Sequence, residues 1–329
     1  MRCPTLSELP AAPQGRTGWP WTVESQQFPG TMPDGRPWPR ISIVTPSYNQ
    51  AQFIEETIRS VLLQGYPELE YILIDGGSSE GTVEIIQKYA QFLTYWISEP
   101  DRGQTHAINK GLTRCSGMIF NWINSDDVLA PGALKRVATL IAEHDALAGA
   151  VVNFGAGPRT TIKNQMLTAA ELIATPKFHQ PGIWLRREYV VDCGGIDESY
   201  HFYFDWDLLV RYFASFPAVF YTDDVLSYFR LHPNSKSGMG QWVEYEQERT
   251  QILKKLIATP DLGSIHGKCS LRLRRDAWWR QLREIGDRPH QTNWRKIIDI
   301  SIGALMDPRV RFDRFTAGAV KALLIRSAQ

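Results

Sequence analysis

Residues 118–127 read MIFNWINSDD, a mostly apolar run that stops at one amide and two carboxylates. The apolar part has the length of a buried parallel strand. In open α/β sheets, ligands bind just beyond the carboxyl ends of the strands, where these oxygens are expected to project. Oxygen ligands suit Mg²⁺ or Mn²⁺, and such an ion suits a substrate that carries phosphates. The alternative is that Asp126 and Asp127 only cap a helix that begins near Pro131.

Residues 41–123 repeat strand, loop and helix about every thirty residues, which predicts right-handed crossovers and a parallel α/β sheet. The expected strands are 41–45, 69–74, 93–97 and 118–123. The expected helices begin near residue 51 and span 81–89 and 107–112.

Polar or glycine-rich residues follow each of these four strands, at what must be one edge of the sheet: Thr45 and Tyr48, then Asp75, Arg102 and Asp126. An acid for a base or ribose, a cation for a phosphate and a pair of carboxylates are typical of a nucleotide site, although structural proteins also carry polar strand ends. The first strand is not followed by G-x-G-x-x-G, and the chain has no G-x-x-x-x-G-K-[ST]. The sequence therefore contains neither a dinucleotide fingerprint nor a P-loop.

The second half of the chain is less periodic. We expect strands at 178–185 and 218–230, a short helix at 186–191 and a helix whose first turn holds Asp205 and Asp207 among aromatic residues. Acidic residues favour helix N-termini, so a structural role is one interpretation. The other is general base catalysis, because dry surroundings raise the proton affinity of a carboxylate. His232, just after the last strand, either meets a phosphate or metal ion or has no such role.

Both ends of the chain differ from this core. Residues 1–40 hold eight prolines and three tryptophans, which indicates an extended arm attached by its aromatic side chains. A disordered leader is the alternative for about the first fifteen residues. Residues 241–329 hold 17 Lys or Arg and 10 Asp or Glu. Helices are expected at 243–256 and 271–285, and the second, with five arginines, Trp278 and Trp279, either lies on an anionic membrane or packs on the catalytic domain.

The 329 residues suffice for one large domain with an appendage or for two domains. The four cysteines lie far apart, which argues against a zinc site or disulfide scaffold and favours a reducing compartment. The sequence shows neither a signal-peptide pattern nor an apolar stretch of membrane-spanning length. We expect a cytoplasmic protein, either free or peripheral at the inner face of the cell membrane.

Five motifs, in this order, resemble the family 2 inverting glycosyltransferases of the GT-A fold. They are IVTPSYN at 43–49, IDGGS at 74–78, EPDRG at 99–103, AINKG at 107–111 and NSDD at 124–127. The resemblance covers about residues 40–237 and implies a Rossmann-like, mostly parallel sheet flanked by helices. It implies three parts: a Pro/Trp-rich arm at 1–40, a GT-A catalytic domain at 41–237 and a basic helical extension at 238–329.

By position, the resemblance also implies the site residues. Those for the nucleotide sugar are Thr45, Pro46, Tyr48, Asp75, Arg102, Asn109, Asn124 and Ser125, and those for Mn²⁺ or Mg²⁺ are Asp126, Asp127 and His232. Asn124 stands where the D-x-D motif of the family has its first aspartate, which weakens one ribose or metal contact and leaves Asp126 as a ligand. Phe204 stands at the first acid of the family's acidic pair, so the base is expected to be Asp205, with Asp207 as the alternative.

The implied reaction is transfer of a sugar, with inversion, from a nucleoside diphosphate sugar to a hydroxyl of a saccharide or lipid-linked saccharide, as in surface polysaccharide or glycolipid biosynthesis. No nucleic-acid partner is expected. One alternative is a sugar nucleotidyltransferase, which usually has a glycine-rich basic loop where this chain has residues 46–49. Another is a non-catalytic, membrane-associated nucleotide-sugar-binding protein, against which the presence of Asp126 and Asp205 argues.

Overall fold

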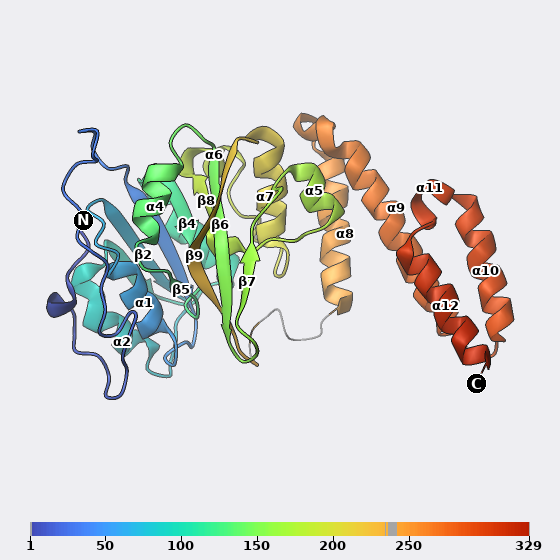
Figure 1. Ribbon diagram of the computed structural model, residues 1–329, viewed down its shortest axis with the longest axis horizontal. Helices are drawn as coiled ribbons and strands as arrows, with labels where there is room; N and C mark the ends of the chain where they lie inside the picture. The colour runs from blue at the N-terminus through green and yellow to red at the C-terminus, as the bar shows by residue number, and fades with distance from the viewer. Residues whose placement is uncertain (1, 234, 236–241, 329) are drawn as a thin grey trace. The chain divides into compact units, whose positions relative to one another are not determined.

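The computed structural model describes residues 2–233, 235 and 242–328 (Figure 1). The chain forms two compact units, Met1–Glu248 and Arg249–Gln329, which are described separately. The boundary expected between residues 237 and 238 lies outside the described residues.

Unit 1 is built around one mixed sheet. In the described part of the chain, the main path of this sheet has the order β3-β2-β1-β4-β8-β6-β9-β5, and β7 pairs with β6. The strands β1 (Ile41–Ser47), β2 (Leu69–Asp75), β3 (Tyr95–Ser98) and β4 (Ile119–Trp122) are parallel to their neighbours in this group. The remaining strands are β5 (Val128–Leu129), β6 (Ala146–Gly155), β7 (Thr160–Lys163), β8 (Ile183–Arg186) and β9 (Val219–Leu231). This arrangement confirms the four parallel strands predicted from the repeat.

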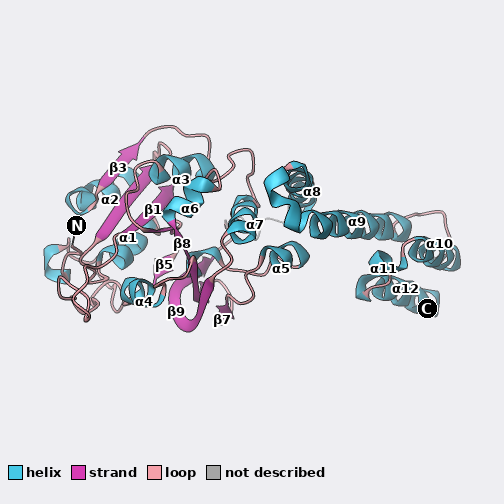
Figure 2. Ribbon diagram, turned by 90° about the horizontal axis from the view of Figure 1, so that it is seen from above, coloured by secondary structure: helices cyan, strands magenta, loops and turns pink. Residues whose placement is uncertain are grey.

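Helices lie on both sides of the sheet (Figure 2). They are α1 (Ile54–Leu62), α2 (Thr82–Tyr89), α3 (Gln104–Leu112), α4 (Ala133–Leu140), α5 (Ala169–Ala174), α6 (Arg187–Asp192) and α7 (Phe204–Ser215). The apolar side of α1 is fully buried through Ile54, Ile58, Val61 and Leu62, as the spacing of these residues predicts. The architecture is the GT-A-type α/β fold expected from the sequence.

Two elements in the second half differ from expectation. The strand predicted at 178–185 begins only at Ile183, because residues Gln180–Gly182 form a 3₁₀ turn around Pro181, which has no backbone N–H to offer to a sheet. The sequence also gave no indication of β6, although this ten-residue strand pairs with three others. Its sequence, ALAGAVVNFG, is rich in alanine and glycine, which have low strand propensity.

The N-terminal arm is attached to the domain, as its tryptophans predict. Trp21 and Trp38 are buried, and the guanidinium of Arg59 in α1 donates to the carbonyl oxygens of Pro10, Pro20 and Trp21. The first residues are held too, because Cys3 is fully buried and its N–H donates to a carbonyl oxygen of the domain. The structure thus favours the attached arm over a disordered leader.

Unit 2 is helical. The second part of α8 (Trp242–Ala258) belongs to it, followed by α9 (Gly263–Gly286), α10 (Asn293–Met306), α11 (Pro308–Arg311) and α12 (Arg314–Ala328). Its apolar core consists of Trp278, Leu282, Ile285, Ile300, Ala304 and Leu323. Trp279 packs against this core and donates to Asp313. The tryptophans of α9 therefore pack inside unit 2. The two placements of this helix considered from the sequence stay predictions. None of the described helices is long and apolar enough to cross a membrane.

Candidate active site

The acidic loop at residues 124–127 lies between β4 and β5, at the carboxyl end of β4. Asp127 is buried, and its Oδ1 accepts from the backbone N–H of Arg230 at 3.0 Å. Burial raises the pKa of the Asp127 carboxyl well above its ordinary value and the charge of Asp126 adds to this, whereas hydrogen bonds from Arg230 and Asn124 oppose it. Asp127 therefore supports the conformation of the acidic loop through its buried hydrogen bond with the backbone of Arg230.

Asp126 has a different setting. Its side chain is 23% exposed, and Oδ2 lies 2.9 Å from Nε2 of His232. His232 follows β9, and its ring packs against that of Phe53 at 4.8 Å between centroids. The structure thus brings together two of the three predicted metal ligands, although they are 106 positions apart. In the described part of the chain, no cluster of three or more His, Cys, Asp or Glu side chains could hold a metal ion.

A carboxylate and an imidazole at this separation still fit Mn²⁺ or Mg²⁺. Such ions are often bound through one or two protein ligands, with water and substrate phosphates completing the coordination. Imidazole and carboxylate are both suitable ligand types for first-row divalent metals. The residues that would hold the ion are Asp126 and His232.

The acidic loop is held by residues that the sequence did not single out. The hydroxyl of Thr57 donates to the carbonyl oxygens of Ser125 and Asp127 at 2.9 and 2.6 Å. Arg230 donates through Nε to the carbonyl oxygen of Asp126 at 2.8 Å and through Nη2 to Glu56 at 2.9 Å. The Arg230 guanidinium also lies over two aromatic rings, those of Phe53 and Phe154. These contacts fix the loop in one conformation.

The residues expected around the nucleobase divide into buried and accessible ones. Thr45 and Pro46 are buried in β1, and the Thr45 hydroxyl bonds to that of Tyr71, whereas Tyr48 is 61% exposed. The hydroxyl of Ser47, which lies between Pro46 and Tyr48 in the sequence, is buried and has no hydrogen-bond partner among the described residues. A buried polar atom without a partner is rare in proteins, which makes Ser47 a candidate for a ligand contact that the sequence analysis missed.

Asp75 is fully buried at the end of β2. Its Oδ2 accepts from the N–H groups of Gly77 and Ser78 and from the hydroxyl of Ser98, and its Oδ1 accepts from the hydroxyl of Ser78. Asp75 therefore organises the loop after β2, and because its side chain is fully buried, a contact with a base would require this loop to move.

Arg102 and Asn109 meet at Glu198. Arg102 Nη2 lies 2.6 Å from Glu198 Oε2, and Asn109 Nδ2 donates to Glu198 Oε1 at 3.0 Å. Burial by itself raises the pKa of Glu198, but these two hydrogen bonds outweigh it and the pKa lies below its ordinary value. Asn109 also exchanges two hydrogen bonds with the backbone of Ile196, so it joins α3 to the loop before α7. The Arg102 side chain is 70% exposed.

Asp205 and Asp207 lie in the first turn of α7, as predicted, but in different surroundings. Asp207 is fully buried and pairs with Arg211 at 2.6 Å, and Arg211 also donates to the carbonyl oxygens of Cys193 and Gly195. Asp205 is partly exposed. The ring of Phe204 lies 6.2 Å from that of Trp122, which places the start of α7 beside the end of β4.

Glu248 in α8 holds the segment directly before α7. Its carboxylate accepts from three successive N–H groups, those of His201, Phe202 and Tyr203, at 2.5, 2.8 and 2.5 Å. Tyr245, one turn earlier, packs against the ring of Phe202 at 4.3 Å between centroids. No local sequence signal marks Glu248, because its three partners lie 45–47 positions away.

Residues 42–198 match the family described as glycosyl transferase family 2. An uncharacterized glycosyltransferase of Rickettsia prowazekii is 25% identical over 233 residues, which cover 66% of this chain and 73% of that protein. A putative teichuronic acid biosynthesis glycosyltransferase, TuaG of Bacillus subtilis, is 38% identical over 108 residues, or 32% of this chain and 43% of TuaG. Residues 42–198 therefore form a glycosyltransferase family 2 domain.

Solved structures share the fold of this glycosyltransferase. TarS of S. aureus in complex with UDP-GlcNAc has a TM-score of 0.59 and 19% identity, with 71% of this chain and 70% of TarS covered. The mannosyltransferase PcManGT from Pyrobaculum calidifontis, in complex with GDP-Man and Mn²⁺, has a TM-score of 0.55 and 20% identity, with 89% of each chain covered. The family match favours glycosyl transfer over both alternatives considered from the sequence, the nucleotidyltransferase and the non-catalytic binding protein.

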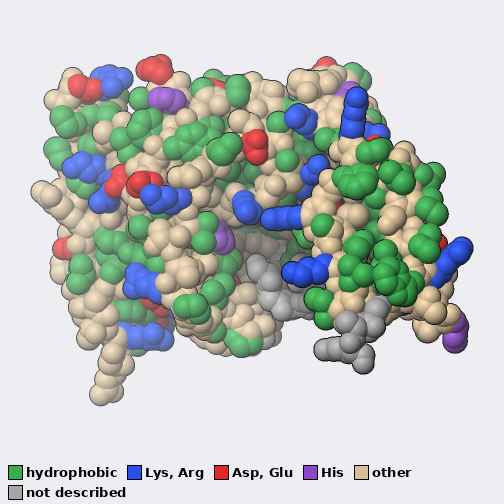
Figure 3. Space-filling view, turned by 45° about the vertical axis from the view of Figure 1, so that its right-hand side comes forward, with side chains coloured by type: hydrophobic (Ala, Val, Ile, Leu, Met, Phe, Trp, Pro, Cys, Tyr) green, Lys and Arg blue, Asp and Glu red, His purple; other side chains and the backbone are tan. Residues whose placement is uncertain are grey.

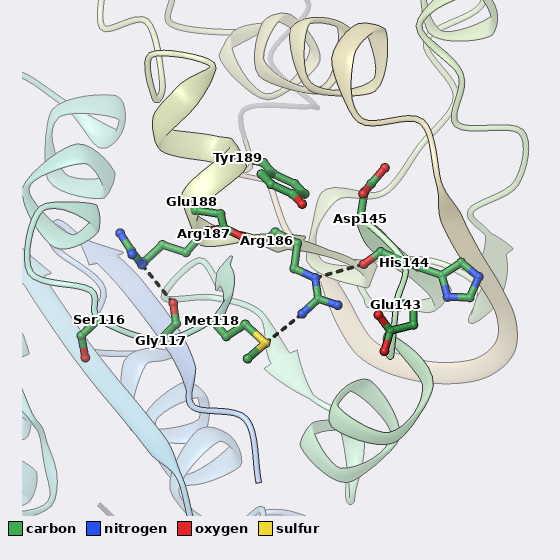
Figure 4. Close-up of a pocket in the computed structure, with 10 residues that line it drawn as sticks. All are labelled: Ser116, Gly117, Met118, Glu143, His144, Asp145, Arg186, Arg187, Glu188 and Tyr189. Carbon is green, nitrogen blue, oxygen red and sulfur yellow. Dashed lines mark hydrogen bonds between the residues drawn. The ribbon is translucent and has the colours of Figure 1, made fainter. Parts of the chain in front are cut away.

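A separate pocket of about 410 Å³ lies at the other end of β4 in the glycosyltransferase (Figure 4). Arg186 donates to the carbonyl oxygen of His144 at 3.0 Å and contacts Met118 Sδ, and Arg187 donates to the carbonyl oxygen of Gly117 at 3.0 Å. Met118 directly precedes β4, and the acidic loop follows its other end. The pocket and the acidic loop therefore lie at opposite ends of this strand. Its arginines hold main-chain carbonyl groups, which indicates a structural role.

Proposed function

We propose that this glycosyltransferase is metal-dependent and inverting, and that it transfers a sugar from a nucleoside diphosphate sugar to an acceptor hydroxyl. The observation that carries the proposal is the pairing of Asp126 with His232 at the carboxyl end of β4, beside the first turn of α7 that holds Asp205. A bound Mn²⁺ or Mg²⁺ would neutralise charge on the departing diphosphate.

The chain's own residues then have separate tasks. Asp205 takes the proton of the acceptor hydroxyl as attack proceeds, a contribution of about 10²–10⁴ in rate. Asp207 is engaged with Arg211 inside the protein, so it is poorly placed as the alternative base. One base on the face opposite the leaving group favours a single displacement, hence inversion. Arg102, released from Glu198, is a cation within reach of a diphosphate.

The nucleotide is expected to contact Thr45, Pro46, Tyr48, Asp75, Asn109, Asn124 and Ser125. Support is strongest at Tyr48, which is exposed. Support is weaker for Asp75, Asn109 and Asn124, whose polar atoms already have protein partners. The proposed catalytic domain, residues 41–237 from the sequence, is best extended to Glu248.

The donor and acceptor classes rest on the relatives. TarS binds UDP-GlcNAc and PcManGT binds GDP-Man with Mn²⁺, which favours a nucleoside diphosphate sugar here. The name of TuaG, a putative teichuronic acid biosynthesis glycosyltransferase, favours a saccharide acceptor in polysaccharide assembly. A lipid-linked saccharide and a location at the cytoplasmic face of the membrane are proposed from the resemblance of the sequence alone.

Calorimetric titration of UDP, GDP and dTDP, each with Mn²⁺ and with EDTA, tests this proposal. We expect one nucleotide to bind with Mn²⁺, to bind more weakly with EDTA and to lose the metal-dependent part in Asp126→Ala. Asp223→Ala is a matched control, because that carboxylate is 74% exposed in a surface ion pair with Lys163. Equal binding of the nucleotide with Mn²⁺ and with EDTA would contradict the metal site.

A further inference from the structure

The helix α10 is apolar on two opposite sides. One side packs into the core of unit 2 through Ile300 and Ala304. The other carries five large apolar residues that are 48–77% exposed, namely Trp294, Ile298, Ile302, Leu305 and Met306. Their spacing of four, four, three and one places them on one side of a helix with 3.6 residues per turn. Polar side chains would normally occupy the exposed side.

The orientation of α10 is fixed by close packing. A Cβ on Gly303 would lie 2.6 Å from the Trp278 ring, so α10 and α9 approach too closely there for any side chain. Lys296, on the same side as Gly303, is buried and donates to the carbonyl oxygen of Gly286 at 2.7 Å. The apolar stripe cannot turn inward without breaking these contacts.

Segments that contact α10 also carry exposed apolar side chains. Phe312 after α11 is 64% exposed, and Phe315 and Ile325 of α12 are 47% and 52% exposed. Together with the five residues of α10 they are called the outer apolar face. Figure 3 shows hydrophobic side chains gathered on the surface of these C-terminal helices, with Lys and Arg side chains at the margin. Exposed apolar groups in this number mark a binding surface more often than a solvated one.

The charge of unit 2 indicates what binds there. Residues 249–329 hold 17 Lys or Arg and 7 Asp or Glu. Arg309, Arg314 and Lys321, close in sequence to the outer apolar face, are exposed. The carboxylates of the same segment are engaged inside the unit: Asp299 with Arg288 and Arg295, Asp307 with Arg274, and Asp313 with Trp279 and Thr316. The exposed charge of this segment is therefore mainly positive.

We propose that the outer apolar face docks onto an anionic membrane surface. Apolar and aromatic side chains bordered by Lys and Arg are the combination that inserts into the headgroup region, with each basic residue adding electrostatic attraction to anionic lipid. A second copy of this unit would bring the same positive charge to the contact, which opposes self-association. The proposal concerns unit 2 alone and does not depend on the proposed donor or metal.

Vesicle sedimentation of the full chain tests this proposal, with phosphatidylcholine vesicles and with vesicles of equal phosphatidylcholine and phosphatidylglycerol. We expect wild type to sediment with the anionic vesicles and more weakly with the neutral ones. The double variant Ile302→Glu/Leu305→Glu should lose at least about tenfold in affinity, because two large apolar groups no longer enter the lipid. Arg309→Ser/Lys321→Ser should lose about fivefold per residue on the anionic vesicles only.

A matched control is Val23→Glu/Val191→Glu, which makes the same chemical change at residues of unit 1 that are 47% and 49% exposed. It should sediment like wild type apart from the small effect of two added charges. Wild type that stays in solution with both kinds of vesicle overturns the proposal. So does a double variant in α10 that binds like wild type.

Two further measurements test whether a second copy of the chain covers the outer apolar face and whether the result depends on a variant that fails to fold. Light scattering of the free protein identifies a second copy as the occupant if wild type is dimeric and the α10 double variant is monomeric, and that result also overturns the proposal.

The conservative variant Trp294→Phe gives a readout in a folded protein, because the blue shift of tryptophan fluorescence on anionic vesicles should shrink when the 62% exposed Trp294 is removed. An unchanged blue shift would show that Trp294 does not enter the lipid and would count against the proposed face.

Discussion

Both units bury some ionisable groups, Lys296 of unit 2 among them, but the exceptions that bear on function differ between the two units. Unit 1 buries charged groups, among them Asp127, Asp207 and Glu248. Unit 2 exposes large apolar groups along α10. Buried polar groups and exposed apolar patches are the informative exceptions in a folded protein. In unit 1, Asp127 and Glu248 accept from backbone N–H groups and Asp207 pairs with Arg211, whereas the exposed apolar residues of α10 lie outside the core of unit 2.

The acids of unit 1 show the same contrast at close range. Asp126 and Asp127 are adjacent, yet one is accessible beside His232 and the other is held inside. Asp205 and Asp207 are two positions apart, and only Asp207 is enclosed with an arginine. In each pair one acid is bonded inside the protein and the other is partly exposed, and the proposed function gives the chemistry to the exposed one. Three substitutions test this division of roles, in order of decreasing expected effect, and a fourth tests a buried acid away from the site.

Asp205→Asn should have the largest effect. It removes the proton acceptor and keeps the shape of the side chain, so kcat should fall by about 10²–10⁴. Donor binding measured by calorimetry should stay within about twofold of wild type, because the base acts on the acceptor. Asp192→Asn, an exposed carboxylate at the end of α6, is the control. Normal turnover by Asp205→Asn would remove this residue from the mechanism.

Asp207→Ala should reduce stability more than chemistry. Removing one partner of a buried ion pair leaves the other charge uncompensated, which costs about 3 kcal/mol. The free energy of unfolding in urea measures this loss. Asp34→Ala is the matched comparison, because its pair with Arg36 lies at the surface and should change stability little. A stable Asp207→Ala enzyme with abolished turnover would instead identify Asp207 as the base.

Glu248→Ala should lower kcat by about tenfold or more, because it frees the three N–H groups that fix the segment before Asp205. The KM for the donor should change little, because Asp126 and His232, the proposed metal ligands, are not altered. Glu248→Gln keeps an acceptor oxygen and should recover part of the loss. Glu244→Ala, an exposed acid one turn earlier, serves as the control. Equal activity of the Ala, Gln and wild-type proteins would show that this anchor does not position the base.

Glu70→Gln should have the smallest effect, at the edge of the sheet away from the site. Burial by itself raises the pKa of Glu70, but hydrogen bonds from Ser42, Ser116 and Gly117 outweigh it and lower the pKa. A lowered pKa in the folded state stabilises the protein above the unfolded value of about 4.3, and this contribution is lost as the pH falls through the folded pKa.

The measurement is the difference in unfolding free energy between wild type and Glu70→Gln across pH. We expect wild type to be more stable by about 1–2 kcal/mol at pH 7, because a buried charged acceptor loses good hydrogen bonds on substitution. The difference should shrink below about pH 4. A difference that is constant with pH would mean that the ionised form of Glu70 has no special stabilisation.

The sequence by itself determined the first half of unit 1. Strands β1 to β4, the helices between them and the polar residues at their ends follow from local periodicity, because parallel βαβ units repeat a short pattern with one handedness. The same local patterns predicted that Asp126 follows a strand and that Asp205 lies in the first turn of a helix. They also indicated His232 as a candidate for contact with a phosphate or metal ion.

Only the tertiary structure decided which acids are accessible, because burial depends on partners that are distant in the chain. Thr57 donates to carbonyl groups of the acidic loop that lie 68 and 70 positions away in the sequence, and Arg230 donates to one that lies 104 positions away. Glu248 accepts from N–H groups that lie 45–47 positions away. The alanine-rich strand β6 likewise forms through pairing with β7, β8 and β9 and not through its own propensity. The inner and outer sides of α10 are both apolar in sequence, and only its packing against Trp278 decides which of them remains exposed.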